Sequence, residues 1–418
     1  MKILHLSTFD TIGGAARAAY RIHQGLRNLE ADSWMLVRKK ASSDSRVIEP
    51  TNTWAKLATH SRAVLNNHPL RRYPGHDSGF SCQWLPDKLF QQVTALNPDI
   101  VNLHWIANGY LQIESLARLK KPVVWTLMDM WPFTGGCHYS GNCMAYKHSC
   151  GQCPLLKSST EIDLSKKIWR RKFKAWESLN LTIVSPSSWL AQGARESQLF
   201  QNLRIETIPF CLDTQIYKPI DQLVARSVYN LPQDKTLVLF GAISATQDQR
   251  KGFHLLQEAL QKLSQTPWKD TIELVVFGSS EPQNPPKLGF KTHYLGHLHD
   301  DASLAVLYSA ANLMIVPSTQ EAFGQTASEA SACGTPVVAF NNSGLTNIID
   351  HKKTGYLAQA LDIDDLVAGI AWLLKDQARY KLVRTQARQK AESEFGLQIQ
   401  AEQYLALFQD LLATGKEN

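Results

Sequence analysis

Short runs of β-branched and apolar residues alternate along this chain with longer stretches of helical periodicity, and this alternation constrains the fold more than any other feature. Such alternation is typical of α/β proteins, in which helices join parallel strands. The runs are apolar throughout rather than at every second position, which indicates strands covered by helices on both faces. The sequence therefore predicts doubly wound parallel sheets.

The predicted strands form two series, which indicates two sheets. They lie at 2–7, 34–38, 100–104, 123–127, 182–185 and 204–208, and then at 236–240, 272–277, 292–295, 313–316 and 336–339. Helices are predicted between them, among others at 15–29, 109–119, 253–263, 303–311 and 325–333, and the pattern from Gly355 to the end is helical. Proline-punctuated sequence between Ile208 and Pro232 marks the joint between two domains.

Composition and charge limit the functional classes. Hydrophobic residues make up 44% and charged residues 19%, which excludes a disordered chain, and no apolar stretch approaches the ~20 residues that span a bilayer. The N-terminus shows no signal-peptide pattern, so we expect a cytoplasmic protein. The formal net charge of +7 permits binding of anions such as nucleotide phosphates, and nothing indicates a nucleic-acid partner.

A predicted helix at 164–179 combines aromatic and basic residues. Ile168, Trp169, Phe173 and Trp176 share one side, and lysines and arginines crowd much of the remainder. One interpretation is peripheral contact with the inner face of the cytoplasmic membrane. The alternative is a packed aromatic stripe beneath a solvated basic face.

The segment 317–334, which reads PSTQEAFGQTASEASACG, carries the strongest motif. A predicted strand ends before Pro317, Glu321 lies in the following loop, and Gly324 opens a helix that contains Glu329. A helix N-terminus with unpaired N–H groups suits a diphosphate, and Gly324 would let it approach the backbone. The two acids can then accept hydrogen bonds from sugar and ribose hydroxyls. The alternative is that both are solvated acids favoured by the helix dipole.

A second motif, Arg250-Lys251-Gly252, follows the strand at 236–240 and its loop. Cations are disfavoured at a helix N-terminus, so a bound diphosphate would explain them there, and the alternative is a solvated loop pair. Gly13-Gly14 opens the first helix and either lets a ligand approach the backbone or forms a tight turn.

Polar and aromatic residues follow two predicted strands of the first series. His104 and Trp105 end one strand, and Asp129 and Trp131 follow the next, with His138 beyond them. Ligands of open α/β sheets bind beyond the carboxyl ends of strands. We therefore consider an acceptor site in which the two tryptophans stack on sugar rings, or alternatively a set of packed, hydrogen-bonded residues.

Four of the seven cysteines lie between positions 137 and 153. Cys150 and Cys153 form a CxxC pair, which is a good zinc half-site, and Cys137 and Cys143 can complete a tetrahedral thiolate site. The alternatives are free buried thiols or a surface disulfide. A metal here would pin a long loop and would not take part in catalysis.

Together these motifs resemble the retaining glycosyltransferases of family 4, which have the GT-B architecture, and in particular the subgroup of bacterial exopolysaccharide assembly that includes colanic-acid-type enzymes. The likeness rests on the Glu-x7-Glu block from Glu321 to Glu329 and on Arg250-Lys251-Gly252. In the first half it rests on Gly13-Gly14 and on the run from WTLMDMWPFTGGCHYSGNC to CGQCP. It covers essentially the whole chain.

The resemblance implies two Rossmann-like domains facing a central cleft. Residues 1–209 would form the acceptor-side domain with its Cys-rich loop at 137–153, residues 210–394 would bind the nucleotide sugar, and a helix at 395–418 would pack back on the first domain. The catalytic residues would be Glu321, Lys251, Arg250 and Asp129; the donor-binding residues Gly13, Gly14, Phe323, Gly324, Gln325 and Glu329; and the acceptor-side residues His104, Trp105, Trp131 and His138. Within this set Glu321 would hold the donor sugar, Glu329 the ribose, and Lys251 the diphosphate.

The activity implied is transfer of a sugar, with retention, from a nucleotide-diphosphate sugar to a glycan or lipid-linked acceptor in polysaccharide biosynthesis, with no cofactor required. Two departures from the family pattern stand out: Ala242 replaces an Arg of many relatives, and Met128 replaces a His. Met128 motivates one alternative, a catalytically impaired glycan-binding relative. Gly13-Gly14 with Arg38 motivates another, an NADP-linked oxidoreductase.

Overall fold

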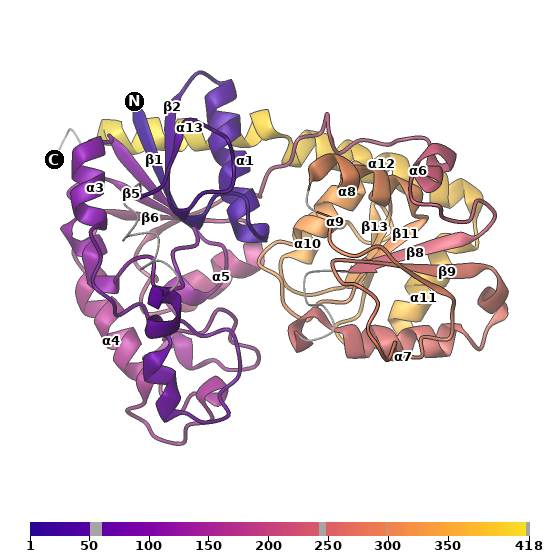
Figure 1. The fold of residues 1–418 in the computed structure, drawn as a ribbon, viewed down its shortest axis with the longest axis horizontal. Coiled ribbons are helices and arrows are strands. Elements are labelled where there is room, and N and C mark those ends of the chain that lie inside the picture. Colours follow the sequence, from indigo (N-terminus) through magenta and orange to yellow (C-terminus); the bar gives the residue numbers. More distant parts are fainter. Residues whose placement is uncertain (51–60, 242–247, 299, 415–418) are drawn as a thin grey trace. The chain divides into compact units, whose positions relative to one another are not determined.

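A computed structural model describes residues 1–50, 61–241, 248–298 and 300–414. The chain divides into two compact units (Figure 1). Unit 1 contains Met1–Cys211 and Leu397–Asn418, and unit 2 contains Leu212–Gly396. The domain limits implied by the resemblance, after residues 209 and 394, each lie two residues before these boundaries.

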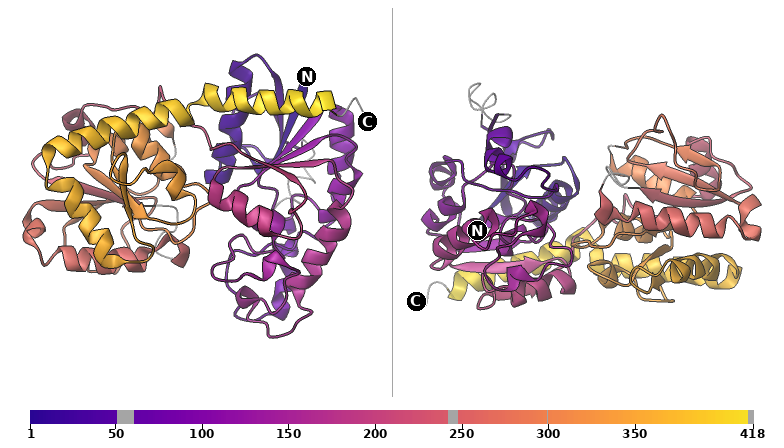
Figure 2. Two further views of the ribbon diagram at one scale, coloured as in Figure 1. Left: turned by 180° about the vertical axis from the view of Figure 1, so that it is seen from behind. Right: turned by 90° about the horizontal axis from the view of Figure 1, so that it is seen from below.

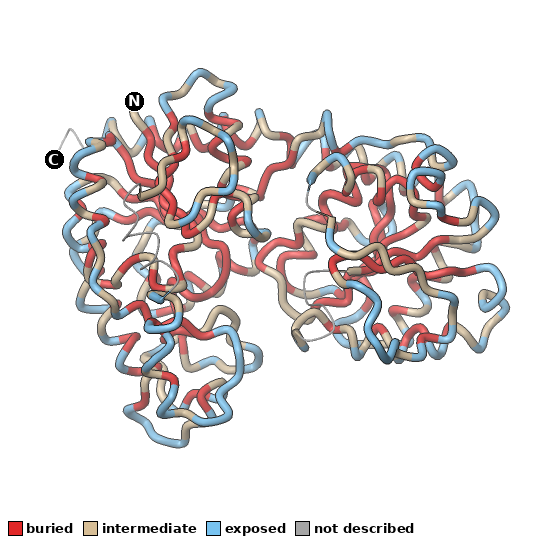
Figure 3. Tube along the Cα trace, viewed as in Figure 1, coloured by how far each residue is buried: buried red, intermediate tan, exposed pale blue. Residues whose placement is uncertain are grey.

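A parallel sheet with the strand order β3-β2-β1-β4-β5-β6-β7 forms the centre of the described part of unit 1. Its strands are β1 (Lys2–Phe9), β2 (Asp32–Lys39), β3 (Val47–Ile48), β4 (Ile100–Leu103), β5 (Val123–Thr126), β6 (Leu181–Ser185) and β7 (Arg204–Thr207). The buried strands appear as red segments in Figure 3. The six predicted strands are present, whereas β3 was missed because two residues give no periodic signal.

The helices of unit 1 are α1 (Gly14–Asn28), α3 (Leu89–Leu96), α4 (Leu164–Trp176), α5 (Ser188–Glu196) and α13 (Leu397–Thr414). Helix α13 packs along α1, which can be followed in the left view of Figure 2 as the yellow helix crossing in front of the indigo one. The contact is close at Gly25, where a Cβ atom would lie 3.0 Å from the Cβ of Ala401. Tyr404 of α13 is fully buried, and its hydroxyl lies 3.1 Å from Thr126 Oγ1 of β5.

The predicted helix at 109–119 is wrong, because only a 3-10 turn at Ile113–Arg118 forms there. Asn108 and Gly109 both have left-handed backbone angles, with φ of 56° and 72°. The side chain of Gln83 then takes the place of helical partners: its amide oxygen accepts from Gly109 N, and its amide nitrogen donates to the carbonyl of Leu111. Side-chain hydrogen bonds of this kind compete with the helix ladder.

A second parallel sheet, with the order β10-β9-β8-β11-β12-β13, forms the centre of the described part of unit 2. Its strands are β8 (Thr236–Gly241), β9 (Ile272–Phe277), β10 (Thr292–Tyr294), β11 (Leu313–Val316), β12 (Val337–Phe340) and β13 (Gly355–Ala358). Strand β13 corrects the prediction of continuous helix from Gly355 onward. Gly355 pairs with Val337, and a Cβ there would lie 2.4 Å from the Val337 carbonyl oxygen.

The helices of unit 2 are α6 (Gln222–Val228), α7 (Phe253–Leu263), α8 (Asp301–Ala310), α9 (Gln325–Ala332), α10 (Leu345–Ile348), α11 (Ile363–Leu374) and α12 (Gln377–Phe395). Apolar residues of α7 and α11, such as Leu260 and Ile370, pack with Val238 and Ile315 of the sheet in one buried core. The two sheets and their helices confirm the predicted α/β fold with two Rossmann-like domains. In the described parts of both units, we find no helix with the length and apolar composition that a membrane span requires.

The basic face predicted for the 164–179 helix is only partly solvated. Lys172 of α4 is fully buried, and Arg171 binds Glu114 and the carbonyl oxygens of Cys82 and Gln83. Phe173 stays exposed and stacks on Trp169. Two cations that the pattern assigned to a solvated face therefore contact other residues of unit 1.

Three histidines are buried together in unit 1. His5 Nδ1 lies 2.8 Å from His104 Nε2, the two rings stack, and the ring of His23 packs edge-on against His5. Burial lowers the pKa of His23 to about 4 and that of His104 to about 3, and it holds the pKa of His5 well below its usual value. All three are therefore neutral at pH 7.

We expect this cluster to make unit 1 sensitive to mild acid. The unfolded histidines bind protons below about pH 6.5 whereas the folded ones do not, so stability falls as the pH drops from about 6.5 toward 4, by about 1.4 kcal/mol per pH unit for each proton involved. Urea unfolding at several pH values, followed by tryptophan fluorescence, measures this slope. The His23→Gln variant should show a shallower slope, and equal slopes in the two proteins would contradict the assignment.

Candidate functional site

The sheet order of unit 2 places one candidate site. From β8 the chain adds β9 and β10 on one side and then returns to add β11 on the other, so the segments that leave β8 and β11 diverge at the same sheet edge. Open α/β sheets bind ligands at such a switch point. The 3-10 turn Gln249–Lys251 follows β8, and the loop with Glu321 follows β11.

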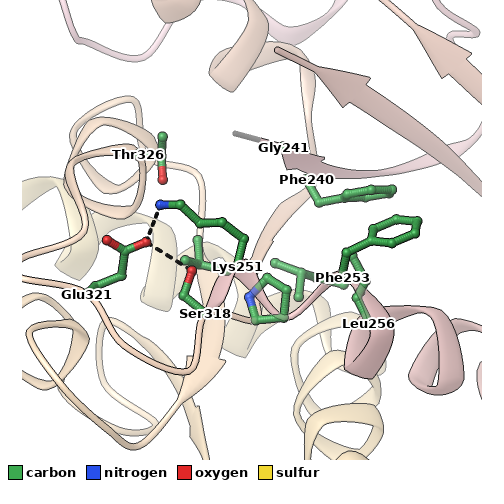
Figure 4. Close-up of a pocket in the computed structure, with 11 residues that line it drawn as sticks. Phe240, Gly241, Lys251, Phe253, Leu256, Ser318, Glu321 and Thr326 are labelled. Carbon is green, nitrogen blue, oxygen red and sulfur yellow. Dashed lines mark hydrogen bonds and ion pairs between the residues drawn. The ribbon is translucent and has the colours of Figure 1, made fainter. Parts of the chain in front are cut away.

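Lys251 and Glu321 meet at this point. Lys251 Nζ lies 2.6 Å from Glu321 Oε1, and the hydroxyl of Ser318 donates to the same oxygen at 3.0 Å (Figure 4). These side chains line a cavity of about 20 Å³. The other lining residues are Phe240, Gly241, Phe253, Leu256, Ile315, Val316, Pro317 and Thr326.

Arg250 joins the two loops rather than facing the cavity. Its guanidinium donates to Asp248 Oδ2 at 2.9 Å and to the carbonyl of Gln320 at 2.8 Å, and it lies 3.6 Å from Glu321 Oε2. Burial alone would raise the pKa of Glu321, but the charges of Lys251 and Arg250 outweigh burial and hold that pKa below its usual value. The carboxylate is therefore ionised and the site holds fixed charges of both signs.

Gly252 allows the two loops to approach each other. Its φ of 69° is left-handed, and a Cβ atom would lie 1.9 Å from the carbonyl oxygen of Pro317. Gly324 has φ of 110°, and a Cβ there would lie 2.7 Å from the Leu345 side chain. The structure thus gives Gly324 a packing role against α10, and the close ligand approach that the sequence suggested stays a prediction.

The other donor-side residues of unit 2 lie in α9 or just before it. Phe323 is buried and packs edge-to-face against Phe395, while Gln325 is the first residue of the helix. Glu329, one turn further, is also buried, and its Oε2 accepts a hydrogen bond from Tyr308 at 3.0 Å. Glu329 is not among the residues that line the Lys251 cavity.

Unit 1 has a corresponding switch point between β1 and β4. Gly13 caps α1 there with φ of 87°, and no heavy atom lies within 4 Å of a Cβ built on it. Gly14 begins α1. The surroundings of Gly13 are therefore open, as a ligand-binding turn requires.

Asp129, after β5, organises the polar group on this side. Its Oδ2 lies 2.6 Å from His138 Nδ1 and accepts from Trp105 Nε1 at 3.0 Å, and its Oδ1 accepts from Trp131 N at 2.8 Å. His138 Nε2 lies 2.9 Å from the hydroxyl of Ser81. The structure thus brings together Asp129, Trp105 and His138.

These residues line a cavity of about 10 Å³ together with His104, Ile106, Ala107, Trp125, Met128, Trp131 and Pro132. Trp131 is almost fully buried, its indole N–H donates to the carbonyl of Ser81, and its ring packs near Trp125. This environment favours the packed interpretation for Trp131, whereas Trp105 is partly exposed.

The sequence reasoning missed Ser318, Ser81 and Lys172. Ser318 could have been found, because it is a polar residue directly at the carboxyl end of β11. Ser81 and Lys172 carry no local signal. Lys172 Nζ lies 3.6 Å from the centre of the Trp131 ring and donates to the carbonyl oxygens of Trp131 and Thr134, and burial lowers its pKa well below the usual value.

The four clustered cysteines line a single cavity. Burial raises the pKa of Cys150 to about 12 and that of Cys137 further, and it also raises the pKa of Cys153. As the side chains stand, the described residues contain no group of three or more His, Cys, Asp or Glu that could hold a metal ion. Cys82, Cys211 and Cys333 are buried outside this cavity. Ala242 lies outside the described residues.

Known proteins resemble this chain in two ways: part of unit 2 matches a family in sequence, and nearly the whole chain matches solved structures in fold. Residues 222–390 match the family "Glycosyl transferases group 1". The chain is 33% identical over 195 residues to a D-inositol 3-phosphate glycosyltransferase of Acidothermus cellulolyticus, covering 43% of each chain, and 28% identical over 228 residues to one of Kribbella flavida, covering 51% of this chain and 53% of the relative. The chain thus spans about half the length of the curated relatives it matches.

Solved structures resemble the chain over nearly its full length. Sucrose-phosphate synthase (tll1590) from Thermosynechococcus elongatus has a TM-score of 0.71 at 19% identity and covers 99% of this chain and 100% of its own. Anabaena Alr3699/HepE in complex with UDP and glucose has a TM-score of 0.67 at 16% identity, with 98% and 100% covered. The chain therefore has the GT-B fold of glycosyltransferases, and its residues 222–390, most of unit 2, match the group 1 glycosyl transferase family.

Proposed function

We propose that this protein is a retaining glycosyltransferase of family 4 that transfers a sugar from a nucleotide-diphosphate sugar to a glycan or lipid-linked acceptor in polysaccharide biosynthesis. The observation that carries the proposal is the ion pair of Lys251 and Glu321 at the switch point of unit 2. The family match of unit 2 favours glycosyl transfer over an NADP-linked oxidoreductase. The named relatives and the UDP and glucose complex of HepE support a nucleotide-sugar donor.

Donor binding would break the ion pair between Lys251 and Glu321 and give each side chain a new partner on the donor. Lys251 Nζ, released from Glu321, would bind the diphosphate, and the freed Glu321 oxygen would accept hydrogen bonds from donor sugar hydroxyls. The main-chain N–H groups of Phe323 and Gly324, at the start of α9, would add to diphosphate binding. Because the site already holds a cation and an anion, the diphosphate can bind the cation, Lys251, and the sugar hydroxyls can donate to the anion, Glu321.

The reaction then needs positioning and charge stabilisation more than an enzyme base. The bond between the donor's anomeric carbon and the phosphate oxygen breaks, a bond to the acceptor oxygen forms on the same face, and the acceptor proton passes to the departing phosphate. Lys251 would stabilise the negative charge that develops on the diphosphate. The remaining rate enhancement would come from holding donor and acceptor in place.

Asp129 and His138 would serve the acceptor. When His138 Nδ1–H donates to Asp129, its Nε2 accepts from Ser81, so the ring orientation is held at both nitrogens. The group would then present a partly exposed indole, Trp105, and a fixed carboxylate to sugar hydroxyls.

A catalytically impaired glycan-binding protein is the second candidate, because an apolar side chain, Met128, lines the cavity beside Asp129. Donor-sugar hydrolysis or transfer above the background rate would argue against this candidate.

Removing either member of the ion pair should abolish most transfer. We expect Lys251→Ala and Glu321→Gln each to lower kcat/KM by about 10²-fold or more, because each loses a group aimed at the diphosphate or the sugar. Release of the nucleotide diphosphate from a panel of nucleotide sugars measures this. Lys262→Ala, which removes an exposed lysine of α7 paired with Asp364, is the control and should retain normal rates. Near-normal turnover in both site variants would contradict the proposal.

A methyl group added at Gly252 should lower the free energy of unfolding of unit 2 and should also weaken donor binding. We expect Gly252→Ala to cost about 2 kcal/mol or more beyond the cost of positive φ, because its Cβ would overlap the Pro317 carbonyl oxygen. Gly296→Ala is the matched control, since Gly296 has nearly the same φ of 67° and only Ser280 Oγ at 3.9 Å. Urea unfolding of both variants measures the difference. Equal stability losses would show that the loops do not need this close approach.

Ligand-induced stabilisation separates the proposed enzyme classes. A nucleotide-diphosphate sugar at 100 times its Kd should stabilise the folded protein by about 2.7 kcal/mol, which raises the melting temperature, whereas NADPH should leave it unchanged. A thermal-shift series with UDP-sugars, GDP-sugars and NADPH makes the comparison. A shift with NADPH alone would overturn the proposal in favour of the oxidoreductase.

A further inference from the structure

The strongest feature outside the proposed donor and acceptor sites is a cavity beside Ser165, at the start of α4 in unit 1, whose walls carry four thiols. Cys137, Cys143, Cys150 and Cys153 all line this space of about 20 Å³. A cavity of this size holds about one water-sized occupant. The other lining residues are Phe80, Gly135, Ser140, Ala145, Tyr146, Gly151 and Ser165, none of which is a carboxylate or an imidazole.

The backbone around these thiols turns tightly and contains little regular structure. Two 3-10 turns, Ala145–Lys147 and Pro154–Leu156, are the helical elements assigned between Cys137 and α4. Cys150, Gly151 and Gln152 have successive positive φ angles of 54°, 110° and 47°. Long loops without regular structure require another source of stability, and small irregular regions commonly obtain it from a disulfide or a metal.

A backbone N–H group already points at one of the sulfurs. Gly135 N donates to Cys150 Sγ at 3.2 Å, and Leu156 N donates to the carbonyl oxygen of Cys153 at 3.2 Å. Amide hydrogen bonds to sulfur stabilise the negative charge of a thiolate, as they do around ligating groups in metal sites. The fully buried Lys172 is close enough to interact electrostatically with Cys137 and Cys150.

We propose that these four cysteines bind one zinc ion in a structural, all-thiolate site. Four thiols release four protons to solvent as four sulfur–zinc bonds form, which leaves a centre of formal charge −2. A soft, closed set of four sulfurs suits tetrahedral Zn²⁺, and the charge would offset the cost of burying Lys172. The side chains as they stand do not form a ligand set, so binding includes rotation of cysteine side chains toward a common centre within the cavity.

Zinc would connect this loop to the acceptor group. Cys137 directly precedes His138, whose Nδ1 lies 2.6 Å from Asp129 and whose carbonyl accepts from Met130 N at 2.9 Å. A metal that holds Cys137 therefore holds the backbone that presents His138. The ion would act as a positioning element and would not touch substrate.

Elemental analysis of the full chain, purified without chelator, tests the proposal. We expect about one zinc per chain in the unmodified protein and in Cys211→Ala, which removes a buried cysteine outside the cavity. Cys150→Ala and Cys153→Ala should each lose most of the metal. If these variants do not fold, titration of the unmodified protein with a mercurial should release about one zinc, detected with a chromogenic chelator, as its cavity thiols react.

Two results would overturn the proposal, and neither depends on transferase activity. One is a purified protein with far less than one zinc per chain that also fails to take up added Zn²⁺ after reduction. The other is a mass about 4 Da below that of the reduced chain, which would show that the four cysteines form two disulfides.

Discussion

The ion pair between Lys251 and Glu321 is the interaction on which the proposed donor site depends. Two oppositely charged side chains that are largely removed from water cost desolvation energy, which their attraction offsets only when the geometry is good. Here Ser318 and Arg250 supply the additional hydrogen bonds and charge that keep Glu321 ionised. Under the proposed function, a diphosphate would take the place of Glu321 at Lys251, and a sugar hydroxyl would donate to Glu321, whose charge Arg250 would continue to offset.

Backbone geometry makes this pair possible. Strands β8 and β11 are neighbours in the sheet although β9 and β10 lie between them in sequence, so residues 70 positions apart meet at one edge. Gly252 then allows the two loops to touch at the Pro317 carbonyl, and Thr319 N donates to the Arg250 carbonyl at 2.8 Å. In unit 1, β4 and β5 are neighbours in the sheet, and the segments that follow them gather Asp129, Trp105 and His138.

Much of the fold could be predicted from the sequence, because buried parallel strands leave short, continuous apolar runs, and the segments with Lys251 and Glu321 follow two of these runs. The predictions that were wrong concern elements whose structure is set by contacts between residues distant in sequence. Strand β13 is recognised only by its pairing with β12, and the 109–119 helix is prevented by Gln83. The environments of Lys172 beneath Trp131 and of Glu329 against Tyr308 are likewise set by tertiary packing, which periodicity does not encode.

A crystal structure with a bound nucleotide-diphosphate sugar tests the central claim most directly. The account predicts a phosphate oxygen within hydrogen-bonding distance of Lys251 Nζ, the amides at the start of α9 directed at the diphosphate, and a sugar hydroxyl on Glu321 in place of Lys251. An unbroken contact between Lys251 and Glu321, with the nucleotide bound away from the β8 and β11 loops, would contradict it.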